Sequence, residues 1–543
     1  MPASRKPERV LVIGWDGATF DIADPMIEQG RLPNLARLME RGVRCDLRST
    51  VPPNSSIAWA SFATGKQAGK HGVYYFVERK PGSYERRLIN STSIDTETLW
   101  SLLSRHDKKI GVINVPITYP PRPVNGTMVT GMLAPSVESS FTWPPTLHTE
   151  LMSRVGWVPM DHVEGGVAYN PNRLELLNEI WRDQERRCEI AQYLMDRDPW
   201  DFFMVVFTSS DRIGHVAFRF LDEAFAAESP DMVAKFGGIL QDTYSQLDRL
   251  TGELLAKVGD ETTILLLSDH GQGPLRKHFH LAKWLIDEGY LVLVPDAEKR
   301  RRGWETRKRR IAGRFRVTAP GRYDRPPWDL VDWSRTRAYT SWGGGEEIVL
   351  INQAGREPEG IVRPGPDYEG LCDEICRKLE TIDDPDLGRP FIPKAYKRAD
   401  LWHGKAVERA PDIQFEVDDV AYHIDSDLFA AEVLTEPTDK VPGMHRMDGI
   451  LAAAGPGISA GASADRNELI DIAPTVCHLL DIPVPEDMDG KVMLNLFTEE
   501  FRSEHGVETG PPTLDSDHGG KEDFGGEEAA AVEETLRAMG YVS

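Results

Sequence analysis

The 543-residue sequence has few cysteines and lacks the long apolar segments of membrane proteins. Its five cysteines are scattered along the chain, which argues against a disulfide-rich secreted scaffold and fits a reducing compartment. No apolar stretch reaches the roughly 20 residues of a transmembrane helix, and the N-terminus leads into a strand-like run without the apolar core of a signal peptide. We therefore expect a cytoplasmic protein that does not engage a membrane.

Positive charge is also scarce. Lys and Arg number 63 against 86 Asp and Glu, giving a formal net charge of -23. Such a field repels polyanions, so we expect no nucleic-acid polymer as a partner. A phosphate ester could bind only where something local reverses the sign of the charge, and bound metal cations would do this. The 40% hydrophobic content is that of a globular protein, and no internal repeat is apparent.

Three short apolar runs indicate buried parallel strands: Arg9 to Gly14, Phe202 to Phe207 and Thr263 to Leu267. Segments with helical periodicity lie between them, among them Leu32 to Arg41. Strands alternating with helices predict an α/β fold with a doubly wound, mostly parallel central sheet flanked by helices.

The change of pattern along the chain predicts four segments. Residues 1–290 form the first part of a catalytic core, 291–400 an inserted or cap region, 401–500 the returning part of the core, and 501–543 an acidic flexible linker with a C-terminal helix. The cap region contains a basic run at residues 299–316. This run would suit an anionic substrate or partner, although a solvated loop is the usual state of such a cluster.

Acidic residues follow each of the three predicted strands, and histidines accompany them. Ligands bind at the carboxyl ends of the strands in open α/β sheets, so these side chains are candidates for a metal site. Another histidine stands immediately before a further predicted strand at Gly449 to Gly455. The candidates are Asp16, Asp211, His215, Asp269, His270 and His445. His278 and His280 could compete as ligands, but they lie further from a strand end and we interpret them as supporting or surface residues.

Ser55 and Ser56 lie where a Pro-containing loop turns into an apolar helix, Ile57 to Ala63. A hydroxyl at this corner can cap the helix by accepting a hydrogen bond from its first free amides. Alternatively, one serine is a nucleophile, with a phosphate held against the same amides. The two roles are compatible, and the surrounding acids and histidines favour the nucleophile.

At these residues the chain resembles the alkaline phosphatase superfamily, and within it the type I phosphodiesterase/nucleotide pyrophosphatase-like branch. The resemblance extends from about Val10 to Asp489 and is strongest to bacterial and archaeal members described as phosphohydrolases or phosphomutases. The segments that carry it are Ile13 to Gly17, Pro53 to Gly65, Lys70 to Gly72, Asp211 to His215, Ser268 to Gly271 and Gly443 to His445.

The resemblance implies two divalent metal ions and a serine nucleophile. Zinc is the favoured metal and manganese the alternative, because the ligands mix carboxylate and imidazole. Ser55 aligns with the family's nucleophile, and Ser56 is the fallback. The implied ligands are Asp211, His215 and His445 for one metal, and Asp16, Ser55, Asp269 and His270 for the other.

The chain also departs from the family pattern. Nucleotide pyrophosphatases carry an Asn shortly after the His-Gly of this motif, whereas Val73 to Phe76 follows Gly72 here. The Arg of monoesterase members has no evident counterpart, and Lys66 is only a nearby candidate. The sulfatase signature is absent, since Ile57 and Trp59 occupy its Pro and Arg places.

We therefore expect a two-metal phosphohydrolase that acts on a small-molecule phosphate ester, of phosphodiester or nucleotide type, through a phosphoseryl intermediate. A phosphomonoesterase or phosphomutase of the same superfamily is the alternative. A metal-binding regulatory protein without turnover is a third hypothesis, against which the complete ligand set argues.

Overall fold

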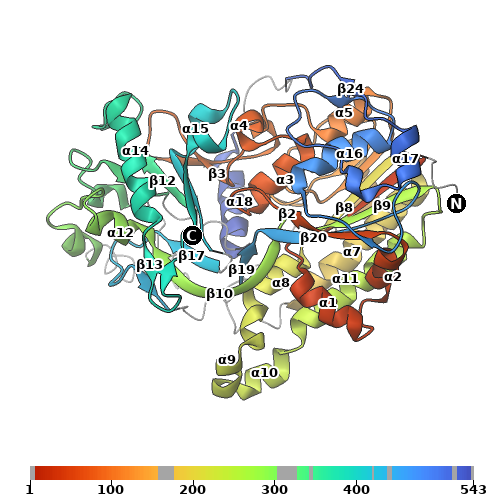
Figure 1. Ribbon diagram of the computed structural model, residues 1–543, viewed down its shortest axis with the longest axis horizontal. Helices are drawn as coiled ribbons and strands as arrows, with labels where there is room; N and C mark the ends of the chain where they lie inside the picture. The colour runs from red at the N-terminus through yellow and green to blue at the C-terminus, as the bar shows by residue number, and fades with distance from the viewer. Residues whose placement is uncertain are drawn as a thin grey trace.

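The computed structural model shows a large lobe built on a central sheet, with a smaller lobe beside it (Figure 1). It describes residues 6–156, 177–302, 327–341, 346–418, 421–436, 443–515 and 523–539. Most of the predicted basic run, residues 303–316, lies outside the described residues.

The central sheet has the strand order β21-β2-β20-β9-β1-β8-β5-β6-β7, with β22 also paired to β2. From β9 to β6 every neighbouring pair is parallel, whereas β20 and β7 run antiparallel to their neighbours in this run. The strands are β1 Arg9–Trp15, β2 Val43–Arg48, β5 Ile110–Ile113, β6 Gly126–Val129, β7 Thr142–Trp143, β8 Phe202–Phe207, β9 Thr262–Leu267, β20 Asp448–Ala454, β21 Ala462–Ser463 and β22 Asn467–Glu468.

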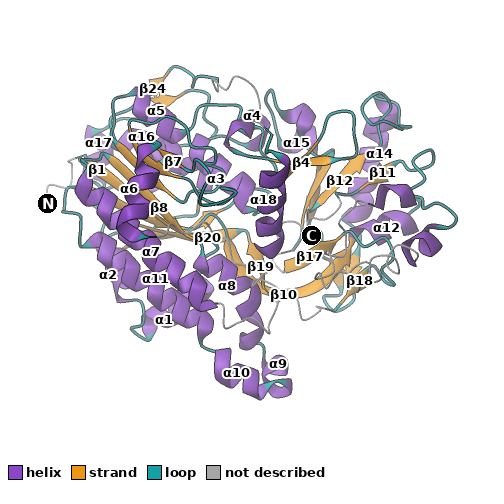
Figure 2. Ribbon diagram, turned by 180° about the vertical axis from the view of Figure 1, so that it is seen from behind, coloured by secondary structure: helices purple, strands orange, loops and turns teal. Residues whose placement is uncertain are grey.

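Helices cover both faces of this sheet (Figure 2). Alternate residues of β1 point to opposite faces, so Leu11 and Ile13 pack in one apolar core and Val10 and Val12 in the other. The first core includes α1 Phe20–Glu28, α2 Pro33–Arg41, α7 Leu177–Arg197, α8 Ser209–Ala217 and α11 Ile239–Leu255; the second includes α3 Ser55–Thr64, α5 Leu99–Arg105 and α16 Ile472–Leu479. The predicted α/β fold with a mostly parallel central sheet is confirmed.

The smaller lobe has its own apolar core around a four-stranded sheet of order β11-β12-β16-β15. The strand β10 links the lobes, because it pairs near its start with β19 and near its end with β17 and β18. These elements are β10 Gly271–His280, β11 Ala338–Tyr339, β12 Ile348–Ile351, β15 Lys394–Lys397, β16 Ile413–Glu416, β17 Ala421–Asp425, β18 Leu434–Thr435, β19 Gly443–Arg446, α12 Leu281–Asp287 and α14 Pro366–Leu379. The division of the chain at residues 290, 400 and 500 stays a prediction.

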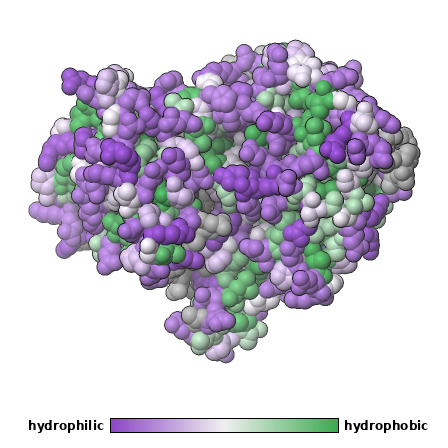
Figure 3. All heavy atoms as spheres, in the orientation of Figure 1, coloured by the Kyte–Doolittle hydropathy of each residue, from purple (hydrophilic) through white to green (hydrophobic). Residues whose placement is uncertain are grey.

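The last helix, α18 Gly526–Met539, folds back on the body as its apolar side predicts. Val532 and Leu536 are fully buried and share an apolar cluster with Phe76 and Ile117. The face in Figure 3 is mostly hydrophilic, with small separate apolar areas. Among the described residues, no helix combines the length and apolarity needed to cross a membrane.

Candidate active site

Two predicted acids meet at the carboxyl ends of neighbouring strands. Strand β1 lies between β8 and β9, with Gly14 in register with both Val206 and Leu267. Asp16 follows β1 and Asp269 follows β9, so both carboxylates emerge at the same edge of the sheet. Both residues are almost completely buried. Parallel pairing of apolar strands therefore brings together acids that are 253 positions apart in the sequence.

The third strand, β8, leads into helix α8, which carries Asp211 and His215 one turn apart. Their four-residue spacing places both side chains on one helix face. His215 Nε2 lies 3.2 Å from Asp211 Oδ1, and both side chains are buried.

His445 arrives from the other end of the chain. It lies within strand β19, paired opposite Gln272 of β10, and immediately before strand β20, as predicted. The strand at Asp448–Ala454 was expected, but the short partner before it was not, because a four-residue strand without apolar alternation gives little signal. The pairing with β10 fixes His445 beside helix α8.

Ser55 is the first residue of helix α3, and Asn54 is its N-cap. The Asn54 side chain accepts hydrogen bonds from the Ser56 amide at 3.0 Å and the Ser56 hydroxyl at 2.6 Å. The interpretation of either serine as the cap is therefore wrong, because Asn54 takes this role. Ser55 is fully buried, and its Oγ lies 3.1 Å from His270 Nε2.

All seven predicted residues thus come together in two adjoining groups. In the first, Asp211 Oδ1 lies 3.2 Å from Nε2 of both His215 and His445, and these two nitrogens are 3.1 Å apart. In the second, His270 Nε2 lies 3.4 Å from Asp269 Oδ2 and 3.7 Å from Asp16 Oδ1. The His270 ring stacks on His445 at 3.8 Å, so it adjoins both groups. Two sets of three residues that span these groups also bring ligand atoms close enough to hold a metal ion: Asp211, His270 and His445, and Asp16, Asp269 and His270.

The histidine tautomers suit metal binding. Nδ1 of His215, His270 and His445 lies 2.7 to 2.9 Å from the carbonyl oxygens of Gly443, Gly271 and Pro53, respectively. Nδ1 therefore carries the proton in the neutral form of each ring, and in that form Nε2 presents its lone pair to the site. The Nε2 lone pairs of His215 and His445 then face one another at 3.1 Å, and they repel unless a cation lies between them.

The carboxylates also indicate that the site binds a cation. Asp269 Oδ2 is buried and accepts no hydrogen bond from the described part of the chain, which is costly without a cation. Ligand atoms separated by 3.1 to 3.7 Å are spaced as around a tetrahedral ion, whose bonds of about 2 Å put its ligands about 3.3 Å apart. The residues present therefore fit two divalent metal ions.

Burial and neighbouring charges shift the pKa values of these groups in different directions. Burial raises the pKa of Asp269 to about 7, with Asp211 adding to the rise. Burial alone would also raise the pKa of Asp211, but the adjacent His215 and His445 lower it well below its usual value. Burial, helped by His445, lowers the pKa of His270 well below that of a free imidazole. A neutral His270 is the form that can bind a metal ion.

Three further residues hold the ligands in place, and none was expected from the sequence. Trp59 Nε1 donates to Asp16 Oδ2 at 3.1 Å, and Gln272 Nε2 donates to Asp211 Oδ1 at 3.2 Å. The amide of Gly17 donates to an Asp269 oxygen at 3.3 Å, and Gly17 has φ +68, with Asp211 only 2.9 Å from where a Cβ would stand. Such contacts join residues distant in sequence and leave no local pattern.

Two other predictions concern residues outside the groups. The Lys66 ammonium is bound by Thr96, at 2.8 Å, and by Asp487, so it is held away from Ser55 as part of a structural network. His278 and His280 are buried in β10 rather than exposed; the His278 ring contacts that of His423 at 5.1 Å.

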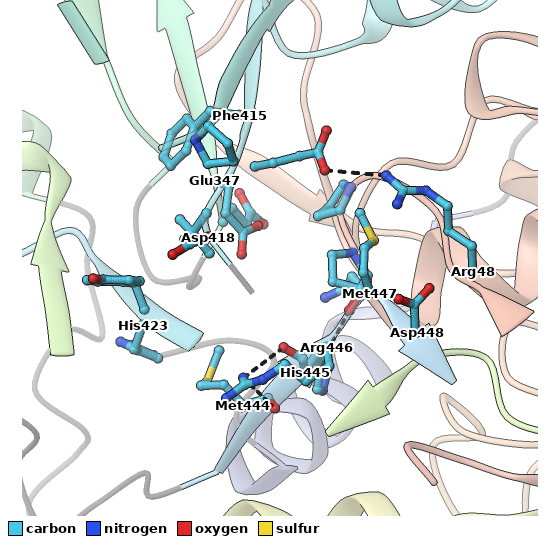
Figure 4. Close-up of a pocket in the computed structure, with 18 of the residues that line it drawn as sticks. Arg48, Glu347, Phe415, Asp418, His423, Met444, His445, Arg446, Met447 and Asp448 are labelled. Carbon is cyan, nitrogen blue, oxygen red and sulfur yellow. Dashed lines mark hydrogen bonds and ion pairs between the residues drawn. The ribbon is translucent and has the colours of Figure 1, made fainter. Parts of the chain in front are cut away.

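A cavity of about 380 Å³ opens beside the first ligand group, between the two lobes (Figure 4). His215, His445 and Asn54 line it from the large lobe. Glu347 and Phe415 line it from the smaller lobe. Substrate bound here would therefore contact both lobes and the candidate metal ligands at once.

The chain belongs to the type I phosphodiesterase/nucleotide pyrophosphatase family, whose model matches residues 10–428. It is accordingly a phosphoric ester hydrolase, and membership implies the use of divalent metal ions, for which the two ligand groups are suited. The resemblance seen in the sequence is confirmed. Among curated proteins, no significant match was found.

Solved structures share the fold. Human ectonucleotide pyrophosphatase/phosphodiesterase 5 is 15% identical, with a TM-score of 0.51 over 90% of this chain and 100% of the other. The murine protein, in an inactive form in complex with AMP, is 14% identical with the same score and coverage. Phosphonoacetate hydrolase from Sinorhizobium meliloti 1021, in complex with phosphonoformate, is 14% identical, with a TM-score of 0.53 over 87% of this chain and 95% of the other.

Proposed function

We propose that this enzyme is a two-metal phosphodiesterase that cleaves a small-molecule phosphodiester or nucleotide-type substrate through a phosphoseryl intermediate. The observation that carries this proposal is the place of Ser55. Its Oγ lies 3.1 Å from His270 Nε2, where the two ligand groups adjoin, at the N-terminus of helix α3.

Asp211, His215 and His445 would hold one divalent ion, and Asp16, Asp269, His270 and Ser55 the other. When bound, these ions lower the pKa of a hydroxyl and stabilise the developing charge on the leaving oxygen.

The residues of the chain position the reacting groups. Asn54 caps helix α3 and so fixes Ser55 at its first turn, with Oγ directed at the ligand groups. The positive end of the helix favours a phosphoryl group beside it. Ser55 Oγ gives up its proton and forms a bond to phosphorus while the bond from phosphorus to the leaving oxygen breaks, and that oxygen takes up a proton to leave as an alcohol. Water then attacks the phosphoseryl ester, and the bond to Ser55 Oγ breaks, restoring the hydroxyl.

The three histidines are each held in one orientation by a backbone partner. A carbonyl oxygen binds each Nδ1 proton, so each ring keeps its tautomer and orientation through the reaction. We further propose zinc as the metal, with manganese the alternative, because imidazole and carboxylate ligands suit both. A cytoplasmic location remains our proposal, supported by five cysteines that are all free and buried.

Replacing Ser55 tests the nucleophile. We expect Ser55→Ala to lower turnover of bis(p-nitrophenyl) phosphate at least 10³-fold while the protein still binds two metal ions, since six other ligands remain. Ser56→Ala is the matched control and should keep most activity, because the Ser56 hydroxyl binds Asn54. Metal content is measured by elemental analysis. Full activity of Ser55→Ala would refute the assignment.

A further inference from the structure

The cavity beside the ligand groups has two chemically different walls. The large lobe contributes the candidate metal ligands His215 and His445. The smaller lobe contributes Glu347, just before β12, and Phe415, Glu416 and Asp418, in and after β16. Figure 4 shows Glu347 and Asp418 close together, across the cavity from His445. A phosphate held at the metal ligands would therefore direct its organic group toward this acidic wall.

Most carboxylates of the cavity are neutralised by arginines. The pairs are Arg48 with Glu416 at 3.5 Å, Arg86 with Glu346 at 3.5 Å, Arg466 with Asp448 at 3.3 Å, and Arg389 with Asp418. These four acids therefore contribute little net charge to a bound ligand.

Glu347 is different. Its carboxylate accepts hydrogen bonds from the Tyr75 hydroxyl, at 3.2 Å, and from its own backbone amide, and it forms no ion pair with any residue in the described part of the chain. Tyr75 lies equally close to Gln414, at 3.2 Å, so its hydroxyl is shared. The nearest charged neighbour, Glu346, is itself acidic, and burial together with this neighbour raises the pKa of Glu347 to about 7. A half-buried carboxylate without a counter-ion is costly, and a bound cation would remove this cost.

Aromatic rings accompany Glu347 on the cavity wall. Tyr75, Phe76, Phe415 and Tyr422 all line the cavity, and each is largely buried by its neighbours. Ring faces attract cations and shield them from water. A carboxylate beside aromatic rings suits a small ammonium group better than a neutral or anionic one.

We infer that Glu347 determines specificity by binding an ammonium group on the organic part of the phosphodiester substrate. This inference rests on the proposed function, since it names the class of ester that the same site accepts. The phosphate lies at the metal ligands, and the ammonium group lies against Glu347 and the rings beside it. The cavity of about 380 Å³ accommodates a short amino-alkyl group next to the phosphate.

Two matched diesters test the inference: 2-aminoethyl p-nitrophenyl phosphate and propyl p-nitrophenyl phosphate, which differ by an ammonium in place of a methyl group. We expect the metal-loaded enzyme to prefer the first by at least tenfold in kcat/KM. Glu347→Gln keeps the shape and the acceptor for Tyr75, so it should reduce this preference to less than threefold. The preference is the ratio of kcat/KM for the two esters in the same protein, so a general loss of activity cancels from it. Glu359→Gln, an exposed change on the same lobe, is the control and should keep the preference.

Equal rates for the two esters in wild type, or a preference that survives Glu347→Gln, would overturn the inference while leaving the phosphodiesterase proposal intact. If wild type cleaves neither ester, the phosphodiesterase proposal fails instead. Calorimetric binding of 2-aminoethyl phosphate and propyl phosphate to metal-loaded Ser55→Ala protein then decides the inference. Tighter binding of the amino compound that is lost with Glu347→Gln supports it, and equal binding refutes it.

Discussion

Trp59 offers a direct test of how the protein holds its metal ligands. Its indole Nε1 donates to Asp16 Oδ2 at 3.1 Å, and the ring is fully buried in the core beneath helix α3. Replacing it with Phe removes the donor but keeps an aromatic side chain. The Asp16 carboxylate then loses the contact that orients it. In the wild-type protein this contact holds Oδ2 against the indole and leaves Oδ1 facing His270.

The magnitude follows from the charge on the acceptor. A hydrogen bond to an ionised carboxylate contributes about 1.5 to 3 kcal/mol, which corresponds to about a 10-fold to 150-fold change in a binding constant. Loss of a partner that orients a metal ligand generally costs about 10-fold to 100-fold in affinity. We therefore expect Trp59→Phe to weaken binding of one of the two zinc ions by about 10-fold to 100-fold.

Calorimetric titration of chelator-stripped protein with zinc measures this effect. Phe62→Leu is the matched control, because Phe62 is also fully buried on helix α3 and packs against Trp59 at 5.4 Å. It should lower the free energy of unfolding by about 1 kcal/mol or more without changing either zinc affinity by over twofold. Equal zinc affinities for wild type and Trp59→Phe would refute the view that Asp16 is a ligand held by Trp59.

Two further predictions concern charges outside the ligand groups. Lys66→Met leaves the partly exposed Asp487 carboxylate without its ammonium partner, so urea titration should show a loss of about 2 to 3 kcal/mol in unfolding free energy. Its kcat/KM should change less than twofold; a large loss of kcat in a stable variant would show that Lys66 contacts the phosphate after all. For Glu347, burial raises the pKa from 4.5 to about 7, so the native protein binds the proton more tightly than the unfolded chain. The resulting stability is complete below pH 4.5 and is lost as pH rises through 7, by up to about 3 kcal/mol. Glu347→Gln lacks this loss, so its free energy of unfolding in urea titrations should rise relative to that of wild type between pH 5 and pH 8. If the difference in unfolding free energy between the two proteins does not change with pH, burial does not raise the pKa of Glu347.

Local sequence patterns predicted the central architecture well. Runs such as Phe202–Phe207 are apolar on both faces, which is the signature of a strand buried between two helical layers. The spacing of Asp211 and His215 suits one helical turn or a compact loop that directs both at one cation, and helix α8 supplies the turn. These features depend on residues within one or two turns of one another, so they can be seen in the chain alone.

The N-cap shows where local patterns stop being sufficient. Asn54, Ser55 and Ser56 are all good capping residues, and the sequence does not distinguish them. Only the path of the chain into helix α3 decided that Asn54 caps it and that Ser55 faces His270. In the same way, the sequence contains Glu347 but not the pairing of its acidic neighbours with distant arginines.

The sequence by itself determined three apolar strands of the central sheet with helices between them, the acids at the strand ends and the serine at a helix start, because these follow from periodicity and residue preference. Tertiary structure decided which of these side chains meet. His445 reaches His215 across 230 positions through the pairing of β19 with β10, and Trp59 reaches Asp16 through packing of α3 on the sheet. Contacts between distant segments depend on the packing of the whole core, and no local pattern encodes them.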